Sequence, residues 1–379
     1  MIEYWQRFYR RSRRRYRNLS WQALHLDPWL LLGLLTLMTG GLIVLYSAGG
    51  ESRYLVEAQM LRFVAAFLAM FLIAQISPRT IMRFAWLFYV FVTLMLLAVE
   101  FFGTYAMGAQ RWLTIPGVVR FQPSELMKLA MPMMLAAWLA RRALPPGWLD
   151  LLVCVALMGL PVGLIANQPD LGTAVLVSAS GIFVVLLAGL SWRVIALCAS
   201  LGLAFMPLLW FNMHDYQRQR VLTFLNPESD PLGSGWNIMQ SKTAIGSGGV
   251  YGKGWMQGTQ SQLEFLPERH TDFIVAALGE EFGLVGMLTL LFCYLLLIWR
   301  GLYMADQSQD TFGKLLGGSL ILTFFVYVFV NIGMVSGVLP VVGVPLPLIS
   351  YGGTASVTLM TGFGMLMAVF THHKSTRRK

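Results

Sequence analysis

Long apolar runs recur along the whole chain and constrain its fold more than any other feature. A helix of roughly 17–25 apolar residues crosses the hydrocarbon core of a bilayer and satisfies its own backbone hydrogen bonds. We predict ten such helices, at residues 29–48, 57–76, 81–99, 124–140, 149–166, 171–188, 192–211, 271–299, 315–335 and 348–370. The expected fold class is all-α, as a polytopic membrane protein with ten transmembrane helices.

The composition leaves no room for a separate soluble domain. Of the 379 residues, 56% are hydrophobic and only 12% are charged. We therefore expect one transmembrane domain over residues 29–370, between a basic segment at 1–28 and a basic tail at 371–379. The first apolar run is longer than the core of a signal peptide, so we expect it to be retained. All three cysteines lie inside apolar runs, which indicates buried thiols rather than a disulfide framework.

The net charge of +10 is interpreted as a topology signal, and nucleic acid is not expected as a partner. Seven arginines lie between Arg7 and Arg17, and four Lys or Arg residues lie in the last six positions. An even number of spans places both chain ends on one side of the membrane. If that side is the cytoplasm, 18 of the 28 Lys and Arg residues are cytoplasmic. The positive-inside rule therefore favours an N-in, C-in orientation.

With this orientation the two long connections, residues 100–123 and 212–270, face away from the cytoplasm. Long connections are uncommon unless they have a function. A dense group of charged side chains, which includes Glu268, His270 and Asp272, lies where the second connection ends and the next span begins. A carboxylate where a membrane helix meets water is costly to keep and can act as a general base. Asp272 is the leading catalytic candidate.

The first long connection carries further candidates for binding an anion. Glu125 and Lys128 are three residues apart at a helix start, so they share one face and can pair. They form either an intrahelical salt bridge or a site in which Lys128 meets an anionic substrate while Glu125 positions it. Arg111 and Arg120 could add phosphate contacts.

Other polar residues, and the glycine-rich stretch, each have two possible interpretations, one structural and one functional. Asp170 could cap the helix that follows it, or it could be a second functional carboxylate on the same membrane face as Asp272. Glu280 and Glu281 lie about two helical turns beyond Asp272, where an acid is either functional or held by hydrogen bonds in tight packing. The glycines of residues 245–255 favour a flexible or tightly turned loop over a phosphate cradle.

Residues 331–355 contain three prolines and repeated glycines next to apolar spans. Irregular backbone at membrane depth is tolerated only where protein or a cavity satisfies its polar groups. We therefore expect this stretch to line a cavity.

Several motifs resemble, in order along the chain, those of the SEDS family (shape, elongation, division and sporulation). They are G-A-Q-R-W-L, R-F-Q-P-S-E-L-M-K, Q-P-D-L-G-T, S-G-G-V-Y-G-K-G, F-L-P-E-R-H-T-D-F-I, G-E-E-F-G-L-V-G and the 331–355 stretch. The runs H-D-Y-Q-R-Q-R and T-Q-S-Q-L-E-F-L-P-E-R-H-T-D look like the RodA branch of Gram-negative bacteria. The resemblance covers essentially the whole chain beyond the basic N-terminus.

The resemblance implies a peptidoglycan glycosyltransferase that polymerises lipid II for cell elongation and rod shape. It implies a site on the periplasmic face of the bacterial inner membrane, and a class B penicillin-binding protein and elongation-complex membrane proteins as partners. Asp272 matches the family's proposed catalytic aspartate, and Glu125, Lys128 and Asp170 match positions regarded as essential. We expect Asp272 as the base for an inverting β-1,4 transfer, with Lys128, Arg111, Arg120 and His270 in substrate binding.

Two other functions remain open from the residues alone. A flippase for a lipid-linked cell-wall precursor would require acids and bases near the midplane, broken helices and inverted repeats. A catalytically silent scaffold would be indifferent to substitution at Asp272. No His/Cys cluster indicates a fixed metal site, although a divalent cation (Mg²⁺ or Mn²⁺) could share the charge of a diphosphate.

Overall fold

The computed structural model describes residues 24–106, 109–115, 119–212, 215–230, 233–263 and 268–372. A helix occupies each of the ten predicted spans. These helices are α3 (Pro28–Ala48), α4 (Arg53–Ala74), α5 (Pro78–Phe102), α6 (Pro123–Leu139), α7 (Trp148–Asn167), α8 (Leu171–Leu187), α9 (Trp192–Asn212), α13 (Ile274–Asp306), α14 (Thr311–Val335) and α15 (Thr354–Thr371). Seven of them, α3, α4, α5, α7, α13, α14 and α15, are long and apolar enough to cross a membrane. The prediction of an all-α, polytopic membrane protein is confirmed.

Local sequence signals determine where these helices begin. The Asp27 carboxylate caps α3 by accepting the Leu30 N–H at 2.9 Å, and Pro28 occupies the first helical position. Ser77 and Pro78 repeat this arrangement at the start of α5. Asp170 caps α8 by accepting the Thr173 N–H at 3.2 Å. The capping interpretation of Asp170 is therefore correct.

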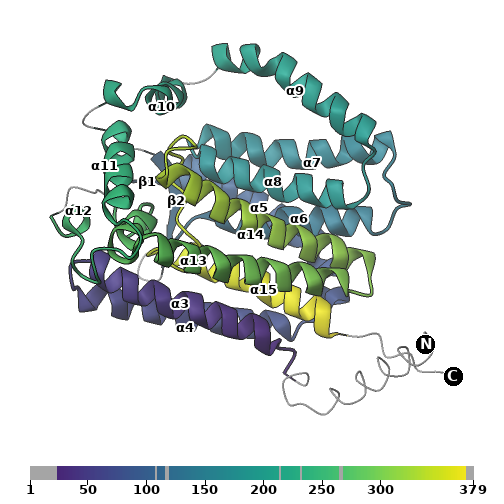
Figure 1. Ribbon diagram of the computed structural model, residues 1–379. Coiled ribbons are helices and arrows are strands. Elements are labelled where there is room, and N and C mark those ends of the chain that lie inside the picture. The colour runs from purple at the N-terminus through teal and green to yellow at the C-terminus, as the bar shows by residue number, and fades with distance from the viewer. Residues whose placement is uncertain are drawn as a thin grey trace, which may run out of the picture.

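The helices form two packed groups (Figure 1). The first group contains α3, α4, α13 and α15, and the second contains α5, α6, α7 and α8. Helix α14 contacts both groups. Helix α9 lies apart from the others in the view. The described chain ends meet at one end of the bundle, where the His25 and His372 rings stack with centroids 3.8 Å apart. The predicted basic segments fall largely outside the described residues.

The long connections contain more secondary structure than the sequence predicted. The second one, predicted as a loop, forms α10 (Asp215–Leu225), a 3₁₀ turn η2 (Pro227–Ser229), α11 (Ser234–Ser247) and α12 (Thr259–Gln262). The first one contains a three-stranded antiparallel sheet of β1 (Thr104–Ala106), β2 (Ala109–Ile115) and β3 (Val119–Phe121). These elements lie at the end of the bundle opposite the described termini (Figure 1), which we call the loop-bearing end. Their helices are too short and polar for an apolar-run analysis to detect.

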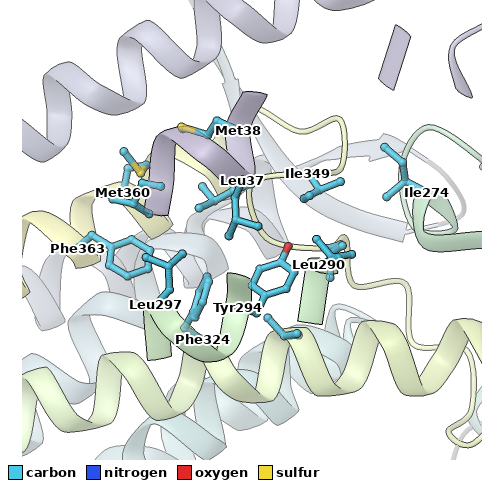
Figure 2. Close-up of a cluster of buried hydrophobic side chains, with 14 of the residues drawn as sticks. Leu37, Met38, Ile274, Leu290, Tyr294, Leu297, Phe324, Ile349, Met360 and Phe363 are labelled. Atoms are coloured by element: carbon cyan, nitrogen blue, oxygen red, sulfur yellow. The ribbon is translucent and has the colours of Figure 1, made fainter. Parts of the chain in front are cut away.

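A buried aromatic residue ties the core to the proline-rich stretch. Tyr294 on α13 is fully buried, and its ring packs against Phe324, which in turn packs against Phe363. The Tyr294 hydroxyl donates to the Pro347 carbonyl at 2.6 Å. Figure 2 shows this oxygen directed toward the loop that carries Ile349. A single polar atom in an apolar core thus fixes an irregular segment.

Helix α13 is broken at Gly283, whose backbone has φ 63° and ψ −159°. The glycine-rich loop 248–255 fills the break and satisfies the backbone groups that it frees. The N–H groups of Lys253 and Gly254 donate to the Glu280 and Glu281 carbonyls, each at 3.0 Å. The Leu284 and Val285 N–H groups donate to carbonyls of the same loop. The loop is therefore tightly turned, as favoured from the sequence, and these N–H groups are committed to protein rather than phosphate.

Gly252→Ala should destabilise the protein, whereas Gly246→Ala should not. Gly252 has φ +80°, and an added Cβ would lie 2.1 Å from the Glu281 carbonyl oxygen. The left-handed backbone alone costs a non-glycine residue about 1–2 kcal/mol. Gly246 lies in α11 with nothing within 4 Å of an added Cβ. Thermal unfolding in detergent should show a lower melting temperature for G252A only; equal melting temperatures would contradict the role of the loop.

Candidate active site

Asp272 lies in the turn immediately before α13, at the loop-bearing end. Its backbone carbonyl accepts a hydrogen bond from the Asn331 amide at 2.9 Å, and the same amide donates to the Val344 carbonyl at 2.7 Å. An added Cβ on Gly343, which has φ +75°, would lie 3.4 Å from the Asp272 carboxylate. The side chain of Asp272 therefore lies against the backbone of the proline-rich stretch, as part of a fixed turn.

The electrostatic surroundings of Asp272 suit proton transfer. Burial raises the pKa of Asp272, the nearby Glu268 carboxylate also raises it, and the Arg220 guanidinium lowers it, so that the pKa is about 6. A carboxylate with this pKa is mostly ionised at neutral pH and still takes up a proton readily. Such a group is matched to general base catalysis near pH 7.

Residues 336–353, which we call the Pro/Gly segment, form the wall beside Asp272. Several of their polar groups pair with the rest of the protein, as irregular backbone within a membrane requires. The Ser350 hydroxyl donates to the Thr271 carbonyl at 2.5 Å, and the Tyr351 N–H donates to the His270 carbonyl at 2.9 Å. The Val342 carbonyl accepts from Arg220 at 3.4 Å. The segment thus holds the turn at residues 270–272 from several directions.

Arg220 is a site residue that sequence reasoning missed. It lies on α10, in the H-D-Y-Q-R-Q-R run. Its contact with Val342 and its effect on the pKa of Asp272 place it beside the candidate base. The signal that could have found it was a cluster of arginines at the start of the same loop that ends at Asp272.

The Q-P-D turn that precedes α8 is held by two other predicted site residues. Arg111 donates from Nε to the Gln168 carbonyl at 3.1 Å and from Nη2 to the Pro169 carbonyl. The Asp170 carboxylate accepts from the Gln122 amide at 2.6 Å in addition to capping α8. At the start of the same helix, an added Cβ on Gly172 would meet Val342 of the Pro/Gly segment at 2.8 Å. The start of α8 and the Asp272 turn therefore both adjoin the Pro/Gly segment.

Glu125 and Lys128 form the predicted i,i+3 pair. The Lys128 ammonium lies 2.5 Å from Glu125 Oε1, and both side chains are about nine-tenths buried. Lys128 also donates to the Tyr327 hydroxyl on α14. The second carboxylate oxygen of Glu125 is buried and has no hydrogen-bond partner among the described residues. The pair is therefore a partly satisfied charged group under the loop-bearing end.

Lys128 lines a pocket between α6, α14 and α15. The pocket has about 430 Å³ of empty space including its mouth, and its lining is mostly apolar. The lining residues are Lys128, Leu129, Leu320, Ile321, Thr323, Phe324, Tyr327, Thr358, Leu359, Gly362 and Phe363. A second pocket under the Pro/Gly segment shares Tyr327 and Leu359 with it. A cation in the lining of a mostly apolar pocket fits an anionic head group with an apolar tail.

Glu280 and Glu281 are held by hydrogen bonds, as their structural interpretation requires. Glu280 is fully buried and accepts from Lys253, Thr259 and the backbone N–H groups of Gln260 and Ser261 at 2.7–3.1 Å. Glu281 accepts from the Ser47 hydroxyl. These two acids attach the loop 248–262 and α3 to the first turns of α13, whose preceding turn carries Asp272.

The remaining predicted site residues are only partly defined. The His270 ring packs edge-on against Tyr351, with centroids 6.1 Å apart. Arg120 pairs with Thr114 in the sheet, but its side chain lies outside the described residues. In the part of the chain that the structure describes, no group of three or more His, Cys, Asp or Glu side chains could hold a metal ion.

Comparison with known proteins gives consistent matches over nearly the full length. The FtsW/RodA/SpoVE family, described as cell cycle proteins, matches residues 20–375. The chain is 54% identical to the peptidoglycan glycosyltransferase MrdB of Escherichia coli K12, over 93% of this chain and 96% of that protein. It is 34% identical to a probable peptidoglycan glycosyltransferase FtsW of Geobacter metallireducens, over 92% and 96%.

Solved structures give the same result. A chain of a structure described as "Structural coordination of polymerization and crosslinking by a peptidoglycan synthase complex" matches with a TM-score of 0.81 and 32% identity, over 91% of this chain and 97% of that one. The rod shape determining protein RodA of Thermus thermophilus matches with a TM-score of 0.69 and 29% identity, over 91% and 96%. The chain belongs to the FtsW/RodA/SpoVE family, the SEDS family that its motifs resemble.

Proposed function

We propose that the protein is a peptidoglycan glycosyltransferase that polymerises lipid II into β-1,4-linked glycan strands for cell elongation. Relatives that match almost the whole chain carry the name of this activity. The observation that carries the proposal in the molecule itself is the Asp272 carboxylate, held in a fixed turn with its pKa raised to about 6.

Asp272 is the general base in this proposal. It removes the proton from the 4-hydroxyl of the acceptor's N-acetylglucosamine, and that oxygen attacks the anomeric carbon of the donor's N-acetylmuramic acid. The bond from this carbon to the lipid diphosphate breaks, so the configuration inverts and the diphosphate leaves with the electron pair. Arg220 keeps the carboxylate ionised at neutral pH while Glu268 keeps it basic.

Lys128 stabilises the departing diphosphate, and the apolar pocket beside it takes up part of the polyprenyl tail. The unpartnered oxygen of Glu125 leaves its carboxylate free to reorient when Lys128 turns toward an anion. Arg111, Asp170 and His270 hold the surrounding turns. The proposed step needs neither the backbone N–H groups of the loop 248–255 nor Arg120.

A class B penicillin-binding protein is the proposed partner, because a matching chain comes from a complex described as coordinating polymerization and crosslinking. We place the protein in the bacterial inner membrane with the loop-bearing end on the periplasmic side, from the charge asymmetry of the sequence. Membrane proteins of the elongation complex are further proposed partners.

A flippase is the second candidate, and the arrangement of the polar groups does not favour it. Apart from the Glu125–Lys128 pair, the described acids of the site lie in turns at the loop-bearing end, and Glu280 is used to attach a loop. A transporter places its binding groups near the bilayer midplane between paired halves.

Asp272→Asn should abolish polymer formation while the protein still reaches the membrane and binds lipid II. Loss of a general base lowers the rate by roughly 10²–10⁴-fold. The measurement is polymerisation of labelled lipid II by purified protein, with and without the partner and with Mg²⁺ or Mn²⁺. Asp306→Asn, at the opposite end of α13, is the matched control. Normal polymer from D272N would refute the assignment, and transbilayer transport by wild type without polymer would support the flippase.

The rate of polymerisation should fall as the pH drops through about 6, because Asp272 becomes protonated. Glu268→Gln removes a negative neighbour that raises the pKa, so it should move the acidic limb to lower pH. Arg220→Gln removes a positive neighbour that lowers the pKa, so it should move the limb to higher pH. Initial rates from pH 4.5 to 8 measure both shifts. Identical limbs in all three proteins would mean that another group titrates.

Lys128→Met should weaken the binding of undecaprenyl diphosphate by about tenfold or more, since a charge-assisted contact to phosphate is lost. Tyr327→Phe, which keeps the ring beside Lys128 and removes only the hydroxyl, should have a smaller effect. Equilibrium binding in nanodiscs measures both. An unchanged dissociation constant for K128M would restrict Lys128 to a structural salt bridge.

A further inference from the structure

We propose that Arg62 on α4 forms a second binding site for a lipid diphosphate, separate from Lys128, and that it holds the acceptor substrate. This inference deepens the proposed function, since glycan polymerisation joins two substrates that are each carried on a lipid diphosphate. None of the sequence patterns considered above pointed to this arginine.

Arg62 is a cation inside a membrane-spanning helix, with no acidic partner in the part of the chain that the structure describes. It lies nine residues after the start of α4, which is roughly 14 Å along the helix axis. Charged side chains at such depth normally pair with an opposite charge or mark a functional site. Among the described residues, no carboxylate lies within ion-pair distance of Arg62. Its contacts are the Tyr351 ring, 4.1 Å from the guanidinium carbon, and the Gln59 amide oxygen at 3.5 Å.

The start of α15 adds backbone donors at the same place. An added Cβ on Gly353, the N-terminal cap of α15, would lie 3.2 Å from Arg62 Cδ and 3.3 Å from Nε. The first N–H groups of a helix have no intrahelical acceptor, and no described side chain caps those of α15. The positive end of the helix dipole and the guanidinium therefore act together on an anion. Nothing lies within 4 Å of an added Cβ on Gly352, so there is space beside them.

The side chain of Gln59 independently indicates that a hydrogen-bond acceptor binds at this place. Its side chain is fully buried, and its oxygen accepts the Gly352 N–H at 3.2 Å. Its amide nitrogen has no hydrogen-bond partner among the described residues. Buried amide donors are rarely left unpaired. A guanidinium, a helix start and an amide thus converge without a described acceptor, which is the chemistry that binds phosphate.

The Arg62 and Lys128 sites lie on opposite sides of α15. Gly353, which faces Arg62, and Gly362, which lines the Lys128 pocket, are nine residues apart. At about 100° per residue, nine residues correspond to roughly half a turn. Helix α15 packs against α4 on one side and α6 on the other. Two lipid diphosphates can therefore bind at the same time without competing for one groove.

The candidate base is connected to the Arg62 site through Tyr351. The Tyr351 ring contacts Arg62 on one side and the His270 ring on the other, and the Tyr351 N–H donates to the His270 carbonyl. An acceptor held at Arg62 is therefore one residue removed from the turn that carries Asp272. With the donor at Lys128, Asp272 is on the acceptor's side, where a base is needed.

The test is native mass spectrometry of the purified protein with lipid II. Wild type should bind two lipid II molecules. Arg62→Gln and Lys128→Met should each bind one, with the lost site weakened at least about tenfold, and the double variant should bind none. Arg62→Lys should restore most of the second binding event, which separates charge from folding. Arg53→Gln, at the exposed first residue of α4, is the matched control and should bind two.

Competition with phosphatidylglycerol identifies the source of the phosphate. Displacement of the second lipid II by an equal concentration of phosphatidylglycerol would mean that Arg62 binds ordinary phospholipid head groups, and would overturn the acceptor assignment. Two lipid II molecules on R62Q with wild-type affinity would overturn the site itself. Polymerisation by wild type in the same preparation tests the proposed function separately. An inactive wild type that binds two lipid II molecules would refute the function while leaving the second site intact.

Discussion

An unpaired polar backbone group inside a membrane costs several kcal/mol, and the rest of this structure depends on that constraint. The Pro/Gly segment is irregular yet lies among apolar helices. The Tyr294 hydroxyl, the Asn331 amide and the Ser350 hydroxyl bond to backbone groups in it or beside it. The same bonds attach the segment to the turn at Thr271 and Asp272. A segment that had to be held by side chains for its own stability therefore also fixes the position of the candidate base.

The same constraint explains the glycine-rich loop. A break at Gly283 frees backbone groups of α13 that water cannot satisfy at this depth. The loop supplies partners for them, and only glycine lets two backbones approach closely enough at Gly252. Glu280 then holds the outer part of the loop through four donors. The glycine-rich loop, which in the sequence could suggest a phosphate-binding site, therefore has a structural role: it stabilises the broken helix that follows the active-site turn.

The polar residues fall into two groups. Some hold turns through hydrogen bonds, and others can still transfer a proton or bind an anion. Arg111 donates to two carbonyls of the Q-P-D turn, and the Asp170 carboxylate accepts from Gln122 and Thr173. Asp272 has a raised pKa. Lys128 is paired, but with a carboxylate that is only half satisfied. Arg62 has an aromatic ring and an amide but no described carboxylate. Two cations on opposite sides of α15 suit a reaction that joins two anionic lipids.

The sequence by itself determined the ten helices, capping of the next helix as one of two roles for Asp170, and Asp272 as the leading carboxylate. Those features depend on runs of apolar residues, on capping side chains and on charges at the ends of spans. All of these are set by residues close together in the chain. Only the tertiary structure placed Arg220 beside Asp272, and Arg62 over the start of α15. These pairings join residues far apart in the chain, and no local period predicts which faces of two apolar helices will meet. The sequence therefore identified the candidate base, and packing decided which groups surround it.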